Sequence, residues 1–397
     1  MPEGISASLQ LREKGKVLWK QWRSWVLKTE KSKGNTETLY FKNMFFPHKI
    51  KKLIGKGCLL GLTLLSMASC SDSFIFEDEG DCSLHYKLKF CYDMNLKWAN
   101  AFASEVKSVR VYIFDEEGSL VKILTEFGDE LKEPDFDIDL DLPKGNYHLV
   151  AWCGIDNPGV EQQSFYAPRE ADLTLQDLYC RLNYKTDHEY SAYSDQHLQF
   201  MFYGNLDVEI EEENDTGGII YYTMPLVKDT NHIRIELVQL SGNPVNVKDF
   251  TFTIDDADGE MNYANSLVGD RVISYIPWHL ENADVELGET RSLIHTQSAV
   301  ADIDVSRMTV GHKKQMRLTI RNSGTGDVIA SVPIIDYALL AKDYYEMAYE
   351  HKMTDQEFLD REDEYSMTFF LDEDLKWINS FIYINSWRIV PHEYGLN

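Results

Sequence analysis

A single cysteine stands where its thiol could accept a lipid. Cys70 ends the sequence Met67-Ala68-Ser69-Cys70 and follows the apolar run 58–65, and four lysines precede that run: Lys49, Lys51, Lys52 and Lys56. A basic segment, a short apolar segment and small residues before a cleavage point are typical of a secretory signal. A cysteine thiolate directly after Ser69 is the nucleophile that diacylglyceryl transfer needs. We therefore expect cleavage between Ser69 and Cys70 and lipidation of Cys70.

The apolar run is too short to cross a membrane, since a spanning helix needs 18 or more apolar residues. Two or three acyl chains, each contributing about 0.8 kcal/mol per buried methylene, would instead anchor the mature protein stably. Residues 1–43 are polar and basic and carry three tryptophans, Trp19, Trp22 and Trp25, at helical spacing. A membrane-surface helix would explain that spacing. We favour instead a translation start at Met44, which gives the signal 44–69 a basic segment of ordinary length.

Four further cysteines remain after the lipidation site, namely Cys82, Cys91, Cys153 and Cys180. In an exported chain they allow three different disulfide pairings, and their spacing does not choose among them. Buried free thiols on strands are the equally weighted alternative. Because the sequence has no CxxC motif and no Cys/His cluster, we expect no structural metal site.

Other residue patterns that could support catalysis are weak. Asp255, Asp256 and Asp258 precede Gly259, but an EF-hand loop would need an acidic residue where Ile254 stands, so a solvated hairpin turn is favoured over a calcium site. The eleven histidines form no HExxH motif, and no GxSxG elbow or phosphate-binding loop occurs. His312, beside two lysines, is most simply part of an exposed basic turn. The sequence therefore predicts no catalytic residue, no cofactor and no metal.

The charge of the mature chain excludes nucleic acid as a partner. The whole sequence has 39 basic and 65 acidic residues, of which 13 and 4 precede Cys70, so that 26 and 61 remain and the net charge is −35. Such a chain repels phosphate backbones and anionic headgroups. The whole sequence has 44% hydrophobic and 12% aromatic residues, which predicts a folded domain and not a disordered chain.

After Cys82, apolar and polar residues alternate with period two, which predicts strands with one buried face. In the first half the apolar positions fall within 84–92, 109–113, 120–124, 136–142 and 147–151. The turn 115–118 predicts a hairpin between the second and third of these strands, and Pro143 to Asn146 supplies a further turn. Together they predict an antiparallel β-sandwich.

A second set of strands follows an acidic stretch, 209–218, that has the composition of a linker or a long turn. Its apolar alternation falls at 233–237, 250–254 and 316–320, and a helical period appears between Tyr337 and Leu359. A terminal strand is expected over 381–390. The predicted organisation is therefore all-β, with an upstream segment (1–43), a signal (44–69), a tether (70–82) and two sandwiches (83–217 and 218–397).

An ordered series of motifs resembles the FimB-type anchor lipoproteins of Bacteroidota fimbriae. The segments that carry the resemblance are 92–95, 111–118, 142–152, 201–204, 231–234, 356–361 and 385–389. They extend over essentially the whole chain after Cys70. The Leu-Pro-x-Gly-x-Tyr piece at 142–147 is common in sandwiches, but the ordered series behind a lipidation signal is specific.

The resemblance implies two tandem transthyretin-like (Greek-key) sandwiches, fixed to the outer membrane by the lipid on Cys70 and exposed at the surface. It further implies that the protein holds the base of a fimbria, influences its length and is joined to the shaft subunit by non-covalent strand exchange. An added strand gains main-chain hydrogen bonds at an open sheet edge. The tail after Val390 is short for a donor strand, so this chain is expected to offer an edge or groove.

A surface lipoprotein that binds a glycan or another host ligand is the alternative function. Such a protein would present exposed aromatic side chains, and the candidates are Trp152, Tyr166, Tyr190, Tyr193 and Tyr203. Aromatic residues more often fill sandwich cores. The two functions predict different surfaces, a compact aromatic patch for the ligand binder and an open strand edge for the anchor.

Overall fold

The computed structural model describes residues 84–189, 191–211, 218–287, 294–378 and 381–390. The chain divides into two compact units, 1–76 and 77–397, and the second contains every element described below. The signal, Cys70, the tether and Cys82 lie outside the described residues.

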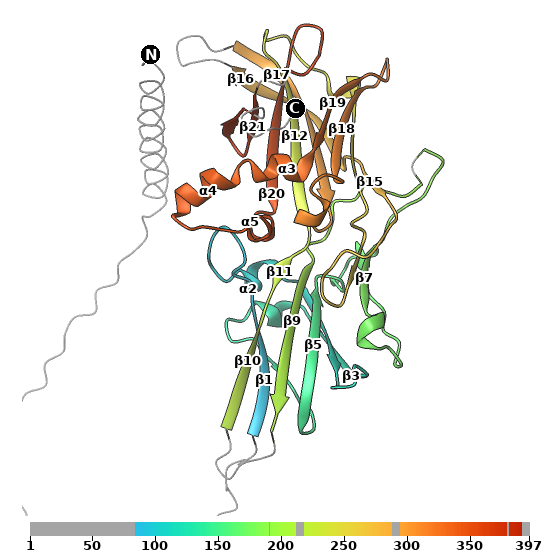
Figure 1. Cartoon of the computed structure of the whole chain (residues 1–397), viewed down its shortest axis with the longest axis vertical. Coiled ribbons are helices and arrows are strands. Elements are labelled where there is room, and N and C mark those ends of the chain that lie inside the picture. The colour runs from blue at the N-terminus through green and yellow to red at the C-terminus, as the bar shows by residue number, and fades with distance from the viewer. Residues whose placement is uncertain (1–83, 190, 212–217, 288–293, 379–380, 391–397) are drawn as a thin grey trace, which may run out of the picture. The chain divides into compact units, whose positions relative to one another are not determined.

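Two sheets form the part of the second unit that is built mainly from the first half of the chain (Figure 1). The smaller sheet has the order β10-β1-β4 and the larger the order β11-β9-β5-β2-β3. Their strands are β1 (Leu84–Cys91), β2 (Ser108–Phe114), β3 (Leu120–Phe127), β4 (Ile138–Asp139), β5 (Gly145–Cys153), β9 (Phe202–Ile210), β10 (Gly218–Pro225) and β11 (Val227–Lys228).

Two further sheets, of six and five strands, are built mainly from the second half, with the orders β16-β17-β12-β20-β21-β22 and β19-β18-β13-β15-β8. Their strands are β8 (Tyr193–Ser194), β12 (Asn231–Gln239), β13 (Phe250–Asp256), β15 (Ile273–Tyr275), β16 (His279–Leu287), β17 (Ile294–Val305), β18 (Arg317–Asn322), β19 (Val328–Pro333), β20 (Glu364–Leu371), β21 (Ile382–Ile384) and β22 (Trp387–Ile389). A small sheet joins β14 (Glu260–Asn262), β7 (Tyr179–Leu182) and β6 (Phe165–Tyr166).

Short helices connect these strands. The α-helices are α2 (Phe102–Glu105), α3 (Ile334–Leu339), α4 (Lys342–Tyr349) and α5 (Asp355–Arg361), and the 3₁₀ turns are η1 (Asp129–Lys132), η2 (Leu175–Asp177), η3 (Val247–Asp249) and η4 (Val310–His312). Thr354 caps α5 by accepting a hydrogen bond from the Glu357 amide. The helical period predicted between Tyr337 and Leu359 is therefore confirmed.

The predicted all-β sandwich architecture is confirmed, and the alternation in β1 shows why. Tyr86, Leu88 and Phe90 are buried, while the residues between them are partly exposed. Strand β2 departs from the pattern because both of its faces are covered. Val111 and its neighbours on one face belong to the core of the first two sheets, whereas Tyr112 and Phe114 belong to a second core.

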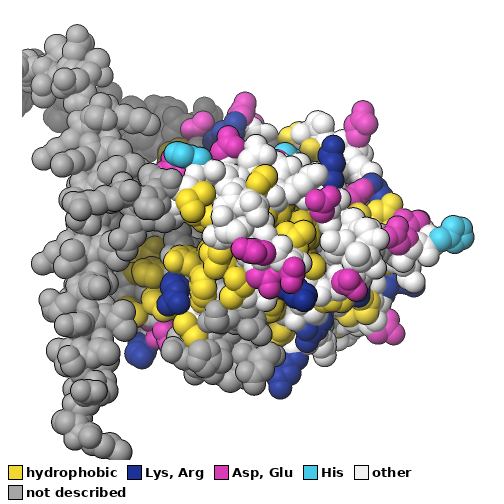
Figure 2. Space-filling view, turned by 90° about the horizontal axis from the view of Figure 1, so that it is seen from above, with side chains coloured by type: hydrophobic (Ala, Val, Ile, Leu, Met, Phe, Trp, Pro, Cys, Tyr) yellow, Lys and Arg dark blue, Asp and Glu magenta, His cyan; other side chains and the backbone are white. Residues whose placement is uncertain are grey.

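The second core is continuous from the outer face of β2 and β5 into the sheets of the second half of the chain. Two strands from the first half also pair with strands from the second, β8 with β15 and β7 with β14. Acidic side chains are spread over the face seen in Figure 2 and do not gather at one place. The two halves of the chain are thus interleaved in one packed body.

Two predicted strands, 136–142 and 381–390, are longer than the strands in the structure. Within 136–142 only Ile138 and Asp139 form a strand, β4, because Pro134 and Pro143 bracket the segment and cannot donate ladder hydrogen bonds. The terminal strand 381–390 is a hairpin of β21 and β22. Asn385 and Ser386 take positive φ of 47° and 69° there and make a two-residue turn.

The predicted domain boundaries stay predictions. Strand β10 begins at Gly218, the residue that the sequence assigned to the second sandwich, yet β10 pairs along its whole length with β1. This pairing favours a boundary after Lys228, where β11 ends and the chain crosses to β12.

Candidate partner-binding surface

Ser69 and Cys70, the predicted sites of signal cleavage and lipidation, lie outside the described residues. Both cleavage and lipidation stay predictions. Cys91, Cys153 and Cys180 are free thiols on strands. Burial raises the pKa of the Cys153 and Cys180 thiols, so both are inert at neutral pH. Among the described residues, no helix is long and apolar enough to cross a bilayer.

The aromatic residues proposed as a ligand platform do not form a common surface. Trp152 is fully buried and Tyr203 is 7% exposed, and both belong to the second core. Tyr166 is exposed, Tyr193 is half-buried, and Tyr190 lies outside the described residues. Trp152 and Tyr203 therefore fill the core, as aromatic residues of sandwiches usually do, and do not belong to a ligand-binding surface.

The turn 255–259 is not the solvated hairpin that the sequence predicted. Asp256 and Asp258 are buried, and the hydroxyl of Tyr275 donates to Oδ1 of Asp258 over 2.7 Å. His312 Nδ1 lies 3.0 Å from each carboxylate oxygen of Asp256, so His312 is not on an exposed basic turn either. Burial raises the pKa of both carboxyls, that of Asp258 strongly. No set of three or more metal-ligating side chains exists within the described ranges.

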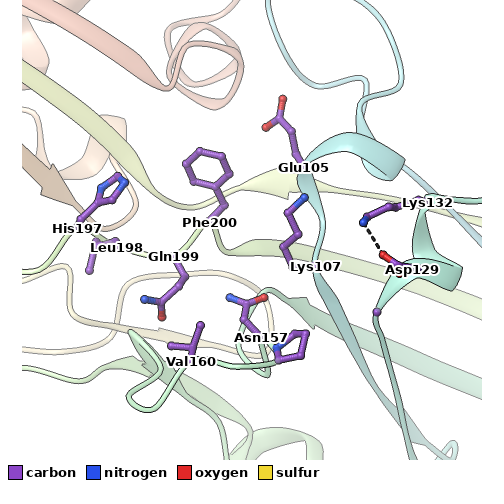
Figure 3. A pocket seen from close by; sticks show the side chains of 12 residues that line it. Glu105, Lys107, Asp129, Lys132, Asn157, Val160, His197, Leu198, Gln199 and Phe200 are labelled. Carbon is purple, nitrogen blue, oxygen red and sulfur yellow. Dashed lines mark hydrogen bonds and ion pairs between the residues drawn. The ribbon is translucent and has the colours of Figure 1, made fainter.

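A pocket of about 460 Å³ lies beside β11, between α2, η1 and the segments 157–160 and 197–200 (Figure 3). Several of its polar side chains are already engaged in hydrogen bonds or ion pairs within the protein. Lys132 Nζ lies 2.5 Å from Asp129, Lys107 Nζ donates to the carbonyl of Ser104, and Gln199 accepts the amide of Ser164 over 2.6 Å. The described lining residues therefore offer no nucleophile with an adjacent base.

The free edge of β10 is the surface best suited to bind another chain. No described strand pairs with this edge. The sequence of β10, Gly-Ile-Ile-Tyr-Tyr-Thr-Met-Pro, contains no charged residue. Ile219, Ile220 and Tyr221 are 51%, 38% and 48% exposed. An edge strand of this length and polarity is open to pairing, because natural edges are usually protected by charges, bulges or proline.

Side chains on both faces hold β10 in place while its main-chain edge stays open. On the core side, the Tyr222 ring stacks on Tyr86 with centroids 6.1 Å apart, and its hydroxyl donates to the carbonyl of Glu209 over 2.6 Å. On the other face, Lys89 Nζ lies 4.2 Å from the Tyr221 ring centroid. A cation over an aromatic ring stabilises this arrangement without using main-chain groups.

The other long edge strands carry the protection that β10 lacks. Strand β16 has Glu281, Asp284 and Glu286, and β3 has Lys122 and Glu126. Strand β19 is also uncharged and ends in proline, as β10 does, but it is only six residues long. Among the described edge strands of eight or more residues, β10 alone is uncharged.

The connection from β11 to β12 fixes the sheet that carries β10 to the second half of the chain. Asp229 in this connection is fully buried, accepts from Asn265 Nδ2 over 3.0 Å and is paired with Arg307. Arg307 also lies 3.1 Å from Asp360 in α5. Burial raises the pKa of Asp229, and the guanidinium opposes that rise. The crossing point is therefore a rigid joint and not a flexible linker.

A second contact supports the same joint from the outside. The Arg361 guanidinium at the end of α5 lies 3.7 Å from the ring centroid of Trp98. Its Nη1 donates to the carbonyls of Asp93 and Asn95. Lys228 pairs with Asp363 on the far side of the joint.

A cluster of histidines around Asp304 completes the joint. Asp304 lies 2.7 Å from His197 Nδ1 and 2.8 Å from His232 Nδ1, and the indole of Trp278 donates to it over 3.0 Å. Hydrogen bonds to Asp302 and Asp304 raise the pKa of His232 to about 9. His232 is therefore cationic at neutral pH and pairs with two buried carboxylates, those of Asp302 and Asp304.

The sequence analysis did not predict β10, because it interpreted 209–218 as a linker or long turn and assigned no strand between that segment and residue 233. The signal was present in the run Ile219-Ile220-Tyr221-Tyr222, which has no polar alternation and no charge within a strongly acidic chain. The joint carried no such signal, since Asp229 and Arg307 are 78 positions apart.

Comparison with known proteins gives matches of two kinds. Residues 78–393 match the model of the family described as fimbrillin-A associated anchor proteins Mfa1 and Mfa2. No curated protein matches the chain. A solved structure from Bacteroides thetaiotaomicron, provisionally described as an adhesin, is 31% identical with a TM-score of 0.67, and the match covers 79% of this chain and 99% of that one.

Two further solved structures share the fold at lower identity. The fimbrial anchor protein Mfa2 from Porphyromonas gingivalis is 17% identical with a TM-score of 0.56 and coverage of 78% and 99%. A second protein from B. thetaiotaomicron, provisionally described as polysaccharide binding, is 24% identical with a TM-score of 0.63 and coverage of 77% and 98%.

Proposed function

Because this chain belongs to the family of fimbrillin-A associated anchor proteins, we propose that it holds the base of a fimbria at the outer membrane and limits the length of the shaft. Membership itself gives the broader role, a fimbrial anchor or adhesin-like protein of the cell envelope, in a family of structural proteins and not of enzymes. The partner is accordingly a fimbrial subunit.

Attachment to the membrane rests on the lipid at Cys70. The signal before Cys70 has the order of a lipoprotein signal, and the body begins at Leu84, fourteen positions later. An extended chain of that length spans roughly 46–50 Å. The tether therefore allows the folded body to stand clear of the headgroups while it stays bound to the outer membrane.

Attachment to the shaft uses the free edge of β10, and this edge is the single observation that carries the proposal. A strand from the shaft subunit pairs with the main chain of β10 and extends the three-stranded sheet. Ile219 and Tyr221 on one face and Ile220 on the other would be covered by alternate side chains of the incoming strand. The neighbouring edges are charged, which directs the strand to β10.

The test replaces the two outward-facing apolar residues of β10 by lysine, as Ile219→Lys together with Tyr221→Lys. Both side chains are half exposed, so the core of the fold is retained although the Lys89–Tyr221 contact is lost, whereas charges along an edge prevent strand addition. Circular dichroism of the purified variant checks that β10 stays folded. The variant is expressed in the source cell in place of the native protein. We expect shed or overlong fimbriae and loss of the shaft subunit from pull-downs of the anchor.

The matched control is Leu280→Lys on β16, which is 48% exposed on an edge of another sheet. Fimbriae of native length that stay attached in the control and not in the β10 variant support the proposal. A β10 variant that retains its shaft as well as the control does would place the shaft contact elsewhere.

The lipid is tested separately with Cys70→Ala. Fimbriae that appear in the medium with the variant at their base support the membrane anchor. Normal fimbriae on the cell, with only the variant released, would show that another component holds the shaft.

A further inference from the structure

One lysine at the joint is enclosed together with two carboxylates. The side chain of Lys228, in β11, is 3% exposed, and its Nζ is in contact with Oδ2 of Asp363, which precedes β20. Oε2 of Glu105, the last residue of α2, lies 3.5 Å from the same nitrogen. The ring centroid of Phe200 lies 3.3 Å from it on a further side. An amine and two carboxyl groups from three distant parts of the chain therefore meet at one point.

Burial distinguishes Lys228 from the other lysines that form ion pairs. Within the described ranges, Lys342 has the next least exposed side chain of this group, at 18%, whereas Lys185 is 47% exposed and pairs with Asp195 at the surface. A buried pair of opposite charges has lost its hydration, and that loss costs free energy. Conversion of such a pair into a neutral group removes this cost.

The fold holds the reacting groups in place and leaves little room around them. The amide of His232 donates to the carbonyl of Asp363 over 2.8 Å, which fixes the backbone of Asp363 against β12. The cavity beside Lys228, which Phe200 and Asp363 also line, measures about 20 Å³. A cavity of this size holds about one water molecule.

We propose that Lys228 and Asp363 condense to an intramolecular isopeptide bond, with Glu105 as the proton carrier. Nζ of Lys228 forms a bond to Cγ of Asp363 while one Cγ–O bond breaks. Two of the three ammonium protons pass by way of the Glu105 carboxylate to the departing oxygen, which leaves as water. Glu105 returns to its carboxylate form. A cation and an anion become a neutral amide and one water molecule, so the step needs no oxidant, reductant or co-reactant.

The folded chain supplies what this reaction lacks in solution. Groups that are held in contact react as if their concentration were far above any that free molecules reach. The bond joins positions that are 135 apart in the sequence and fastens the joint covalently. The inference concerns the joint alone and does not rest on the fimbrial role.

Intact-mass spectrometry of the mature chain with Cys70→Ala, under reducing conditions, tests the bond. The folded protein should weigh one water molecule less than its sequence requires. The same chain purified in denaturant, without a folding step, should have the full mass and lose the water after refolding. A tryptic digest of the folded protein should contain peptides 186–234 and 362–376 joined together, with no cleavage after Lys228.

Two variants and one internal control assign the roles. Lys228→Arg keeps a cation beside both carboxylates but has no primary amine, so it should have the full mass. Glu105→Gln removes the proton carrier and should slow the loss of water during refolding by about a hundredfold or more. Lys185 and Asp195 lie 2.7 Å apart at the surface, and their peptides should stay separate.

Three results would overturn the proposal. A folded native chain that keeps the full mass after prolonged incubation would show that Lys228 and Asp363 form an ion pair only. A loss of water that maps to Asp258-Gly259 would be cyclisation of an aspartyl side chain onto the next amide. Condensation at the native rate in Glu105→Gln would remove Glu105 from the mechanism.

The native chain decides the first two of these results, so a variant that fails to fold does not leave the question open. None of the three bears on whether fimbriae remain attached in the β10 and Cys70 variants. Failure of the isopeptide bond and failure of the anchor function are therefore distinguishable.

Discussion

At the scale of single residues, the buried ion pair of Asp229 and Arg307 makes the sharpest prediction. Arg307→Met leaves the Asp229 carboxylate buried with only Asn265 as partner. Removing one partner of a buried pair is expected to lower the free energy of unfolding by about 3–5 kcal/mol, as measured by denaturant titration.

The double variant Asp229→Asn/Arg307→Met separates the missing charge from the missing contacts. Because it removes the fully buried carboxylate, while Asp360 keeps its hydrogen bond from Gln356, it is expected to recover more than half of that loss. Arg321→Met on the exposed side of β18 serves as the control and should change stability by less than about 0.5 kcal/mol. Equal losses in the single and double variants would contradict the importance of the buried charge.

His232 gives a dependence of stability on pH. Its pKa is raised to about 9 by hydrogen bonds to Asp302 and Asp304, so the folded state holds this proton more tightly than the unfolded state. The resulting stabilisation is fully present below pH 6.5 and is lost as the pH rises through 9. Solvent exposure of about a third of the side chain reduces the effect, and we expect a loss of about 1–2 kcal/mol between pH 7 and pH 10.

The control for this titration is His232→Gln, measured over the same pH range. The other basic side chains near the site, Arg234, His197 and His279, stay in place in this variant. The unfolding free energy of the variant should be lower than that of the native chain at pH 7 and should change less between pH 7 and pH 10. A slope equal to that of the native chain would assign the pH dependence to other groups.

The sequence alone could not predict which acidic side chains are buried. Asp256 and Asp258 look in sequence like any acidic turn before a glycine, and only the tertiary fold brings Tyr275 and His312 against them. Cys70, in contrast, is readable from sequence because its neighbours in the chain define the signal.

At the scale of elements, the hairpin of β21 and β22 is strained at one exposed position. Ser386 takes a φ of 69°, which glycine adopts without a steric penalty. Ser386→Gly is therefore expected to raise the free energy of unfolding by about 0.5–1 kcal/mol in thermal or denaturant titrations. Ser331→Gly in β19, at an extended exposed position, should lower it by a similar amount; a loss in both would contradict the strain.

Element prediction from sequence succeeded where one face of a strand is buried, as in β1 and β12. The strand predicted at 109–113 is also present as β2, but the expectation of one buried face was wrong there, because both faces of β2 are covered. Element prediction failed to see β10, whose exposed apolar run has neither alternation nor a turn signal inside it. The edge that we propose to bind the shaft is thus an element that period-two alternation does not detect.

At the scale of the whole molecule, the two halves share the second core and are held together by the buried ion pairs of the joint. We therefore expect calorimetry of residues 70–397 to give a single unfolding transition, with calorimetric and van't Hoff enthalpies that agree. Two resolved transitions would show that the halves unfold independently. The sequence predicted two tandem sandwiches but could not predict their fusion, because β7 and β8 pair with strands some 80 positions away.

The parallel pairing of β1 with β10 decides how the body responds to mechanical load. If Cys70 is lipidated as proposed, a pull from the membrane reaches the described body at Leu84, and its component along β1 is opposed by β10, which pairs with all eight residues of β1. In this shear geometry the hydrogen bonds of the strand pair resist together, whereas a hairpin peeled from one end would yield one bond at a time. The strand that follows the tether is thus oriented to withstand the drag that flow imposes on a filament.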